Sequence, residues 1–572
     1  MPQRSDRACR LGWSGFERAR GGNVAILFAF LSVPMLMFTG AAIDYGFATR
    51  LETKLQAATD ATALLLCQTP LTTSNADLNL MAQAAMTGAM GAANLVVNPL
   101  AITSNPRQIT LTVHKLSTVF FGKVTGTNRI NPGATAQCAT PLPKTFEIAL
   151  VLDNTGSMAA SSGGQSKLQA VQSAASDFIS YVYTNAAFSS ATRISIVPFA
   201  GAVAVDPSTY RYANWIDQNG QSSYHWTNVL QPGNSNFKSR FDIFAKLQGA
   251  YSGWGWGGCL ETLPYPLNVQ DGAPTSGNRD SYFVPLFAPD EPGDASTTYA
   301  AYQVGRYTTY YSYNSYIDDD NGNCPPLAPG TPFNTAEGQA CKYVRPQNAA
   351  PTALNTSTGI PNGPNFGCTT QPLLRLTNDT SALKSLIGKM APVGATNIHE
   401  GFMWGWRTLS PKSVFTDTNP PAAYASSSNS TNATTINKII ILMTDGTNSW
   451  TPNPNTPNGS LYFAAGYFQN ANGTNPNGRL PAGNQNVSDA PGARNALDAL
   501  TAEACRNARG VNISVYTIGF SVPTDPIDAA GQTLLRNCAS NPGQFYLANT
   551  SDDLIKAFQQ IRASIGALRL TQ

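Results

Sequence analysis

Acidic and hydroxyl side chains stand together at a point where a buried strand is expected to end. Asp153, Thr155 and Ser157 form a D-x-T-x-S pattern directly after the apolar run FEIALVL. Open α/β sheets place their ligand sites at the carboxyl ends of strands, so this position favours binding. Carboxylate and hydroxyl oxygens are the ligands that Mg²⁺ prefers, because it is a hard ion that holds its waters tightly.

The pattern resembles the first part of the metal-ion-dependent adhesion site (MIDAS) of von Willebrand factor A (VWA) domains. The second part corresponds to Thr396, in GATNIHEG before an expected helix, and the third to Asp445, which ends IIILMTDG. The resemblance implies that Ser157 and Thr155 coordinate the ion directly, and that Thr396 joins them when a ligand is bound. Asp153 and Asp445 would act largely through waters. Thr155 stands where many relatives carry serine, and it retains the hydroxyl.

A divalent ion that contacts two carboxylates mostly through water stays electrophilic. Its open position should therefore attract an anionic oxygen, such as an Asp or Glu of a partner protein. Mg²⁺ is the expected ion, with Ca²⁺ or Mn²⁺ as alternatives. The other interpretation is that these residues only cap a strand-to-helix turn, since Asp, Ser and Thr are common N-cap residues.

The segments that position these residues alternate between strand and helix from Phe146 onward. This order predicts an α/β fold with a doubly wound, mostly parallel sheet, VWA-like and Rossmann-like, over residues 144–572. Expected strands are Phe146–Leu152, Arg193–Ala200, Lys438–Gly446, Asn512–Phe520 and Gln544–Ala548. Expected helices are 167–183, 381–390, 397–409, 493–509, 527–537 and 552–565.

A long irregular stretch interrupts this pattern at about residues 201–376. It is rich in Tyr, Trp, Gly and Asn, and it holds four cysteines. A connection of this length is uncommon inside a compact domain, so we expect a large disulfide-containing insertion.

One apolar segment near the N-terminus is long enough to cross a membrane. Residues 24–43 carry no charge, and about 20 residues in a helix span a hydrocarbon core of about 30 Å. Five arginines precede the segment, so residues 1–22 should be cytoplasmic, residues 23–43 transmembrane, and the rest outside a bacterial inner membrane. A cleaved signal peptide ending near residue 41 is the alternative. Helical spacing of apolar residues from Leu51 to Leu65 favours a retained helix that continues past the membrane.

This segment also resembles a known family. The runs GGNVAILFAF, GAAIDYG and LETKLQAATDATALLL are similar to the N-terminal part of TadG-like proteins of Tad/Flp pilus-assembly systems. Residues 256–261, 289–292 and 404–407 and the CAS at Cys538 also match such proteins. The resemblance implies a TadE/TadG-like helix after the apolar segment. The alternating residues at 108–120 predict one or two strands, so residues 44–143 should form this helix and a small α+β stalk.

The cysteines are segregated by the apolar segment. Cys9 precedes it and the other eight follow it, which suits an oxidising compartment outside the membrane. Cys67 and Cys138 are the only cysteines of the stalk region, so we expect them to pair. Cys505 and Cys538 are expected neighbours, and the four cysteines of the insertion should staple it in a connectivity that the sequence leaves open.

Several functions are disfavoured. A net charge of +3 with dispersed arginines does not indicate a nucleic-acid partner. His399-Glu400 begins like a zinc-protease helix, but Met403 replaces the second histidine, and we expect helix surface there.

The main hypothesis is a non-enzymatic pilus-assembly or pilus-associated protein that uses the ion to bind a partner. The partner would be a pilus protein, or a host or surface protein that offers a carboxylate. One alternative is a scaffold that docks through its insertion, with the metal only stabilising the fold. A remote one is a metal-assisted hydrolase using His399 or Glu400 as the base.

Overall fold

A computed structural model gives the fold of the chain. The N-terminal residues assigned to the cytoplasm above, Cys9 among them, lie outside the part that it describes. The described residues are 23–70, 73–103, 107–122, 126, 129–139, 144–162, 164–185, 187–229, 233, 235–293, 301–304, 308–319, 322–324, 332–349, 360–424, 436–469 and 477–567.

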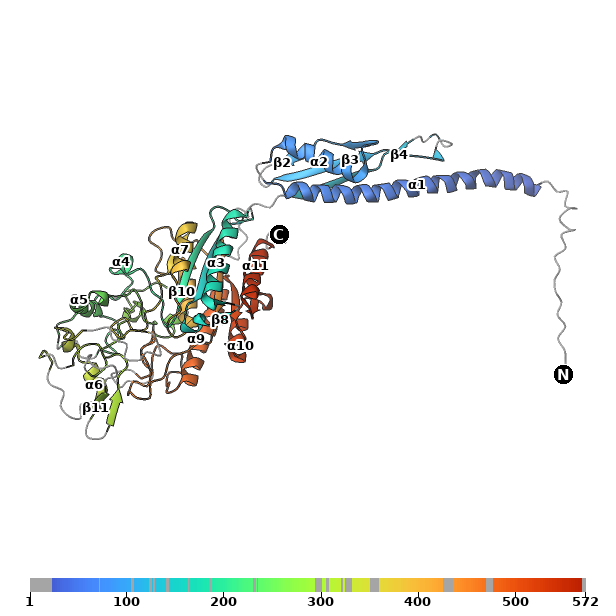
Figure 1. The fold of residues 1–572 in the computed structure, drawn as a ribbon. Coiled ribbons are helices and arrows are strands. Elements are labelled where there is room, and N and C mark those ends of the chain that lie inside the picture. Colours follow the sequence, from blue (N-terminus) through green and yellow to red (C-terminus); the bar gives the residue numbers. More distant parts are fainter. Residues whose placement is uncertain are drawn as a thin grey trace, which may run out of the picture. The chain divides into compact units, whose positions relative to one another are not determined.

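The chain divides into two compact units, residues 1–142 and 143–572. In the first unit, the helices α1 and α2 accompany a small antiparallel sheet, in which β3 pairs with β1, β2 and β6 (Figure 1). The bounds are α1 Asn23–Cys67, α2 Asn75–Met90, β1 Leu95–Val97, β2 Ala101–Thr103, β3 Gln108–Lys115, β4 Ser117–Thr118, β5 Arg129–Ile130 and β6 Gly133–Ala139. The strands expected at 108–120 are confirmed as β3 and β4.

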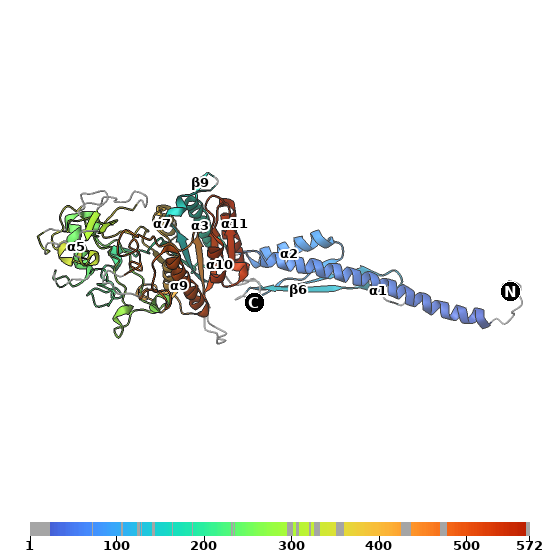
Figure 2. The same cartoon turned by 90° about the horizontal axis from the view of Figure 1, so that it is seen from below.

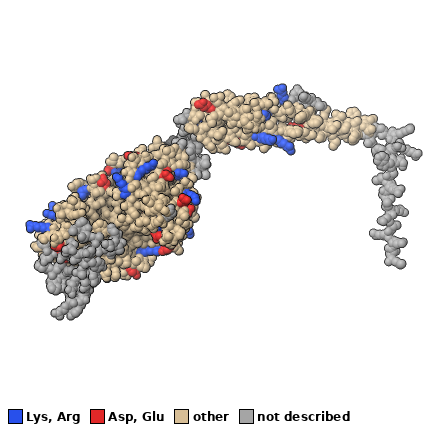
Figure 3. Space-filling view, viewed as in Figure 1, with Lys and Arg blue, Asp and Glu red and all other residues tan. Residues whose placement is uncertain are grey.

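The two halves of α1 have different surroundings. Beyond the apolar run, Leu55 and Leu66 are buried against α2 and against Ile109 and Leu111 of β3. The N-terminal half is apolar and exposed, and α1 is long and apolar enough to cross a membrane. Figure 3 shows no charged side chain on that end of α1. The expected continuation of the apolar helix into a packed helix is therefore confirmed.

The second unit contains a six-stranded sheet in the order β13-β10-β7-β14-β15-β16. All neighbours pair in parallel except the edge strand β13, which is antiparallel to β10. The predicted doubly wound, mostly parallel α/β fold is confirmed. The strands are β7 Phe146–Asp153, β8 Ser161–Ser162, β9 Gln165–Ser166, β10 Arg193–Phe199, β11 Ala301–Val304, β12 Thr308–Tyr311, β13 Leu374–Thr377, β14 Asn437–Thr444, β15 Ser514–Phe520 and β16 Phe545–Ala548.

Helices cover both faces of this sheet (Figures 1 and 2). Alternate residues of β7 point to opposite faces, as a strand requires: Ile148 and Leu150 pack with α3, α7 and α11, whereas Ala149 and Val151 pack with α8 and α9. The helices are α3 Lys167–Thr184, α4 Pro207–Tyr210, α5 Arg240–Ala250, α6 Phe333–Glu337, α7 Thr380–Lys389, α8 Ile398–Leu409, α9 Ala490–Gly510, α10 Ala529–Cys538 and α11 Ser551–Ala567.

Two expectations need correction. The insertion ends earlier than residue 376, because residues from Leu374 already form β13 of the central sheet. His399 does not lie on a helix surface, since every residue of α8 is buried. The physical reason is that the insertion packs over α8: the ring of Trp404 lies 6.3 Å from that of Trp215 and 5.1 Å from that of Phe283.

Four disulfides link the eight cysteines that follow the apolar segment. Cys67–Cys138 in the first unit and Cys505–Cys538 between α9 and α10 are confirmed. The insertion carries Cys259–Cys368 and Cys324–Cys341, a connectivity that the sequence left open.

Buried acids make the stability of the second unit depend on pH. Glu337 of α6 is fully buried, and Asn458 donates to both of its carboxylate oxygens at 2.9 Å. Burial, followed by the charge of Glu291, raises the pKa of Glu337 from 4.5 to about 8. The folded state therefore holds a proton that the unfolded chain has lost between these pH values. This contribution to stability is full below pH 4.5 and falls as the pH rises to 8.

We expect Glu337→Gln, which stays neutral, to gain stability relative to the natural protein between pH 5 and pH 8. Urea unfolding of both proteins across this range measures the difference. Parallel stability curves for the two proteins would show that Glu337 titrates alike in the folded and unfolded states.

Candidate functional site

Asp153 lies at the carboxyl end of β7, beside the end of β14. Thr444 of β14 donates from Oγ1 to Asp153 Oδ2 at 2.6 Å, and the backbone N–H of Thr155 donates to Asp153 Oδ1 at 2.8 Å. Burial, followed by the charge of Asp445, raises the pKa of Asp153 to about 7. Within the described chain no basic side chain forms an ion pair with Asp153. A cation placed beside it would therefore favour its ionised form.

The two hydroxyls of the D-x-T-x-S pattern lie next to Asp445. Thr155 Oγ1 and Ser157 Oγ are 3.0 Å apart, and Ser157 donates to Asp445 Oδ1 at 2.8 Å. A single 3₁₀ turn, Gly156–Ala159, follows Thr155. This short turn carries Ser157, whose hydroxyl reaches Asp445 just after β14.

The segment that carries Thr396 is held against the Thr155–Ser157 segment by a backbone hydrogen bond. The N–H of Gly156 donates to the carbonyl of Gly394 at 2.9 Å. The backbone of Thr396 exchanges two 2.9 Å hydrogen bonds with Ser449, which follows β14. A Cβ on Gly446 would stand 3.9 Å from both Ser157 Oγ and Thr396 Oγ1. The structure thus brings the predicted side chains into one group, called here the oxygen cluster: Asp153, Thr155, Ser157, Thr396 and Asp445.

Two charged residues beside the cluster were not predicted. Lys167 has a fully buried side chain, and its ammonium lies 2.7 Å from Asp445 Oδ2 and 2.6 Å from Asp525 Oδ2. Burial raises the pKa of Asp445, and the charge of Lys167 opposes this rise. Lys167 is the first residue of α3, where the helix dipole disfavours a cation. A lysine is unfavourable at the start of a helix unless a carboxylate lies near it in space. This position was therefore the sequence signal that could have indicated such a partner.

The oxygen cluster has the composition that a hard divalent cation requires. Two carboxylates and three hydroxyls converge, and such oxygen donors suit Mg²⁺. Among the described residues there is no cluster of three or more His, Cys, Asp or Glu side chains that could hold a metal. A metal here would therefore depend on the hydroxyls of Thr155, Ser157 and Thr396 as much as on the carboxylates.

The bases considered for hydrolysis are engaged elsewhere. The ring of His399 is buried, with Nε2 2.8 Å from the carbonyl oxygen of Asn268 in the insertion. Glu400 is also buried, with Oε2 3.9 Å from Arg407 Nη1. Among the described residues, the side-chain partners of the Ser157 hydroxyl are Thr155 and Asp445, not His399 or Glu400.

Residues 22–65 match the family model described as "Putative Flp pilus-assembly TadE/G-like". The chain carries a TadE/G-like segment. This TadE/G-like segment corresponds to most of α1, including the whole apolar run. No curated protein sequence matches the chain.

Solved structures similar to the chain include three proteins of bacterial pili. The pilus adhesin SpaC from Lactobacillus rhamnosus GG is 11% identical at a TM-score of 0.31, covering 83% of this chain and 35% of SpaC. The vWF domain of the type V pili tip protein Mfa5 from Porphyromonas gingivalis is 11% identical at 0.30, covering 76% and 98%. The adhesive tip pilin GBS104 from Group B Streptococcus agalactiae is 11% identical at 0.32, covering 74% and 100%. The chain thus spans about a third of the length of SpaC. At these identities and TM-scores, the likenesses do not bear on the function of the second unit.

Proposed function

We propose that the chain is a membrane-anchored, non-enzymatic pilus-assembly or pilus-associated protein whose VWA-like unit binds an acidic partner through a divalent ion. The observation that carries the proposal is the convergence of five oxygen-bearing side chains from three distant segments at the carboxyl ends of β7 and β14. Thr155, Ser157 and Thr396 would supply hydroxyl ligands. Asp153 and Asp445 would supply the negative charge. The bound ion would offer an electrophilic position to a carboxylate of the partner.

The N-terminal part supports the location in the cell. The TadE/G-like segment includes the apolar exposed half of α1, which suits a single crossing of the inner membrane. The disulfides of both units suit an oxidising compartment outside that membrane. Pilus proteins, or a surface protein offering a carboxylate, would be the partners there.

A binding assay tests the proposal. The full chain is kept in detergent, and pilus fibres are sheared from the cells that produce the protein. We expect binding in Mg²⁺, and a loss of about tenfold or more in affinity in EDTA or in Asp153→Ala, corresponding to about 1.4 kcal/mol. Asp177→Ala is a matched control, because Asp177 is exposed on α3. Equal affinities in Mg²⁺ and in EDTA would refute the metal-dependent mechanism.

A scaffold that docks through its insertion is the second candidate, favoured by the dense packing of the insertion on α8. In that case the ion would only stabilise the fold. Thermal melts of the same proteins separate the two: a scaffold predicts that Asp153→Ala lowers the melting temperature while the affinity of the folded fraction stays unchanged.

A further inference from the structure

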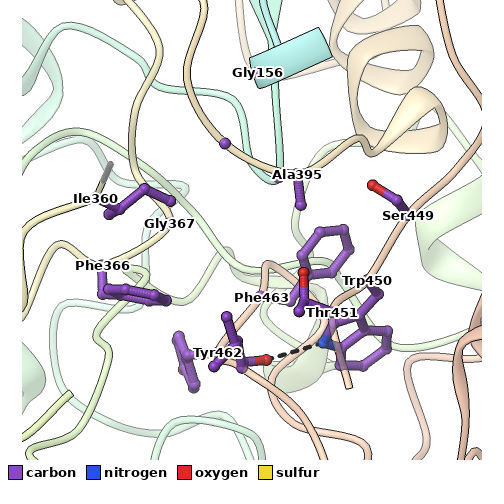
Figure 4. A pocket seen from close by; sticks show the side chains of 13 residues that line it. Gly156, Ile360, Phe366, Gly367, Ala395, Ser449, Trp450, Thr451, Tyr462 and Phe463 are labelled. Atoms are coloured by element: carbon purple, nitrogen blue, oxygen red, sulfur yellow. Dashed lines mark hydrogen bonds between the residues drawn. The ribbon is translucent and has the colours of Figure 1, made fainter. Parts of the chain in front are cut away.

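A cavity of about 310 Å³, whose lining residues are shown in Figure 4, is bounded in part by neighbours of the oxygen cluster in the chain. Three of its lining residues flank proposed metal ligands. Gly156 stands between Thr155 and Ser157, and Ala395 precedes Thr396. Ser449 holds the backbone of Thr396 through two hydrogen bonds. A partner segment whose carboxylate reaches the oxygen cluster would therefore have this cavity directly beside it.

Polar and apolar surface contribute about equally to the lining of the cavity, and none of its lining residues is charged. Phe366, Trp450, Tyr462 and Phe463 surround it (Figure 4). The indole N–H of Trp450 donates to the carbonyl of Leu461 at 3.0 Å. The hydroxyl of Tyr462 donates to the buried Glu261. Because these polar atoms are already bonded within the protein, the two rings present apolar surface to the cavity.

Glycines keep the space open. A Cβ on Gly201 would stand 3.2 Å from the ring of Phe463. Gly367 and Gly394 have φ angles of +86° and +102°, which other residues rarely adopt. We call this site the aromatic pocket.

We propose that the aromatic pocket receives an aromatic or large aliphatic side chain that neighbours the metal-binding Asp or Glu of the partner protein. The inference rests on the proposed function, since it presumes a carboxylate at the oxygen cluster. A volume of about 310 Å³ lies at the low end of the range of about 300–1,000 Å³ for ligand sites, which suits one side chain better than a folded element. Acidic and apolar anchors side by side would give sequence specificity that a metal–carboxylate bond alone lacks.

Selection from a phage-displayed library of random linear peptides tests this specificity. The full chain is held in detergent with Mg²⁺, and bound phage are eluted with EDTA. We expect the eluted peptides to carry Asp or Glu with a Phe, Tyr, Trp, Leu or Met close to it in sequence. Acidic residues with random neighbours would overturn the pocket inference and leave the proposed function standing. The absence of any EDTA-eluted acidic peptide would overturn both.

A variant that fills the pocket gives a second test. Thr451 is exposed and lines the cavity, so Thr451→Trp should block it, whereas Asn455→Trp places the same ring on the same loop outside the lining. The probes are a selected peptide and its analogue with alanine at the apolar position. We expect the alanine analogue to bind the natural protein about tenfold more weakly, and Thr451→Trp to weaken only the parent peptide. Equal weakening of both peptides by Thr451→Trp, or an alanine analogue that binds the natural protein as tightly as its parent, would contradict the inference.

An independent observation concerns the membrane end of the first unit. The backbone N–H groups of Phe120, Phe121 and Gly122 donate to the carboxylate of Asp44 at 2.9, 2.8 and 2.7 Å. Asp44 directly follows the apolar run of α1. A Cβ on Gly40, inside that run, would stand 2.7 Å from the side chain of Phe121. The loop is therefore fixed against α1 where the proposed membrane span ends.

Exposed aromatic rings gather at this level. The side chains of Phe120 and Tyr45 are 68% and 72% exposed, and the ring of Phe120 lies 6.1 Å from that of Phe47. Aromatic residues favour the boundary between lipid headgroups and hydrocarbon. We infer that Phe120 and Phe121 enter this boundary on the outer side, as a second membrane contact beside α1.

Fluorescent labels in phosphatidylcholine–phosphatidylglycerol vesicles test the contact. Each protein carries Cys9→Ser and one new cysteine bearing an environment-sensitive dye, at Phe120, at Leu80 on α2 or at Phe30 in the proposed span; all three side chains are well exposed. We expect spin-labelled lipid to quench the dyes at positions 120 and 30 and to leave position 80 unquenched. Quenching at 30 with none at 120 would overturn the loop contact alone. No quenching at 30 would overturn the membrane anchor and the loop contact with it.

Discussion

Replacing Lys167 with methionine should lower the free energy of unfolding of the second unit by about 3–5 kcal/mol in EDTA. The ammonium of Lys167 is fully buried and pairs with Asp445, whose side chain is also fully buried. Removing one partner of a buried ion pair leaves an uncompensated charge in a region of low dielectric. Asp525 contributes less, because its side chain is 45% exposed and water can solvate it.

Chemical denaturation of the purified protein measures this loss, with Lys384→Met as the control because Lys384 is exposed on α7. If the oxygen cluster binds a divalent ion, saturating Mg²⁺ should shrink the deficit of Lys167→Met. The ion replaces the positive charge that the variant lacks beside Asp445, so it should bind the folded variant more tightly than the folded natural protein. A loss below about 1 kcal/mol in EDTA, the scale of an exposed pair, would show that the Lys167–Asp445 pair is not a buried structural element.

Replacing Glu261 with glutamine should destabilise the second unit by a similar amount, about 3–5 kcal/mol. Glu261 forms ion pairs with both Arg240 and Arg479, and all three side chains are buried. An arginine cannot lose its proton at any ordinary pH, so the variant leaves two buried charges with no anion between them.

The same variant should loosen one wall of the aromatic pocket, since Tyr462 donates its hydroxyl to Glu261. Denaturation at pH 7 measures the stability. Glu503→Gln is the matched control: Glu503 is half-buried on α9, and we expect a change within about 0.5 kcal/mol. Equal stabilities of the two variants would mean that the guanidinium groups of Arg240 and Arg479 find other partners.

Local pattern was enough to predict the elements of the central sheet. The apolar runs of β7, β10, β14 and β15 are buried on both faces, and continuous apolar runs are typical of such strands. The strand β13 was missed because it is only four residues long and lies at an edge, where half-buried residues give no clear alternation. Similarly, His399 was expected on a helix surface, and only the packing of the insertion over α8 explains why every residue of α8 is buried.

The candidate site divides in the same way. The sequence by itself determined that Asp153, Thr155 and Ser157 follow one strand and that Asp445 follows another, because strand ends are local features. Only the tertiary structure decided that Thr396 reaches them, since that depends on the hydrogen bonds of Gly394 and Ser449. The same holds for Lys167, whose partners Asp445 and Asp525 are distant in the chain. The walls of the aromatic pocket likewise come from six separate stretches of the chain, at residues 156, 201, 360–367, 394–395, 449–451 and 461–463. Ion pairs and pockets between distant segments form only when the chain is packed, so local sequence pattern does not reveal them.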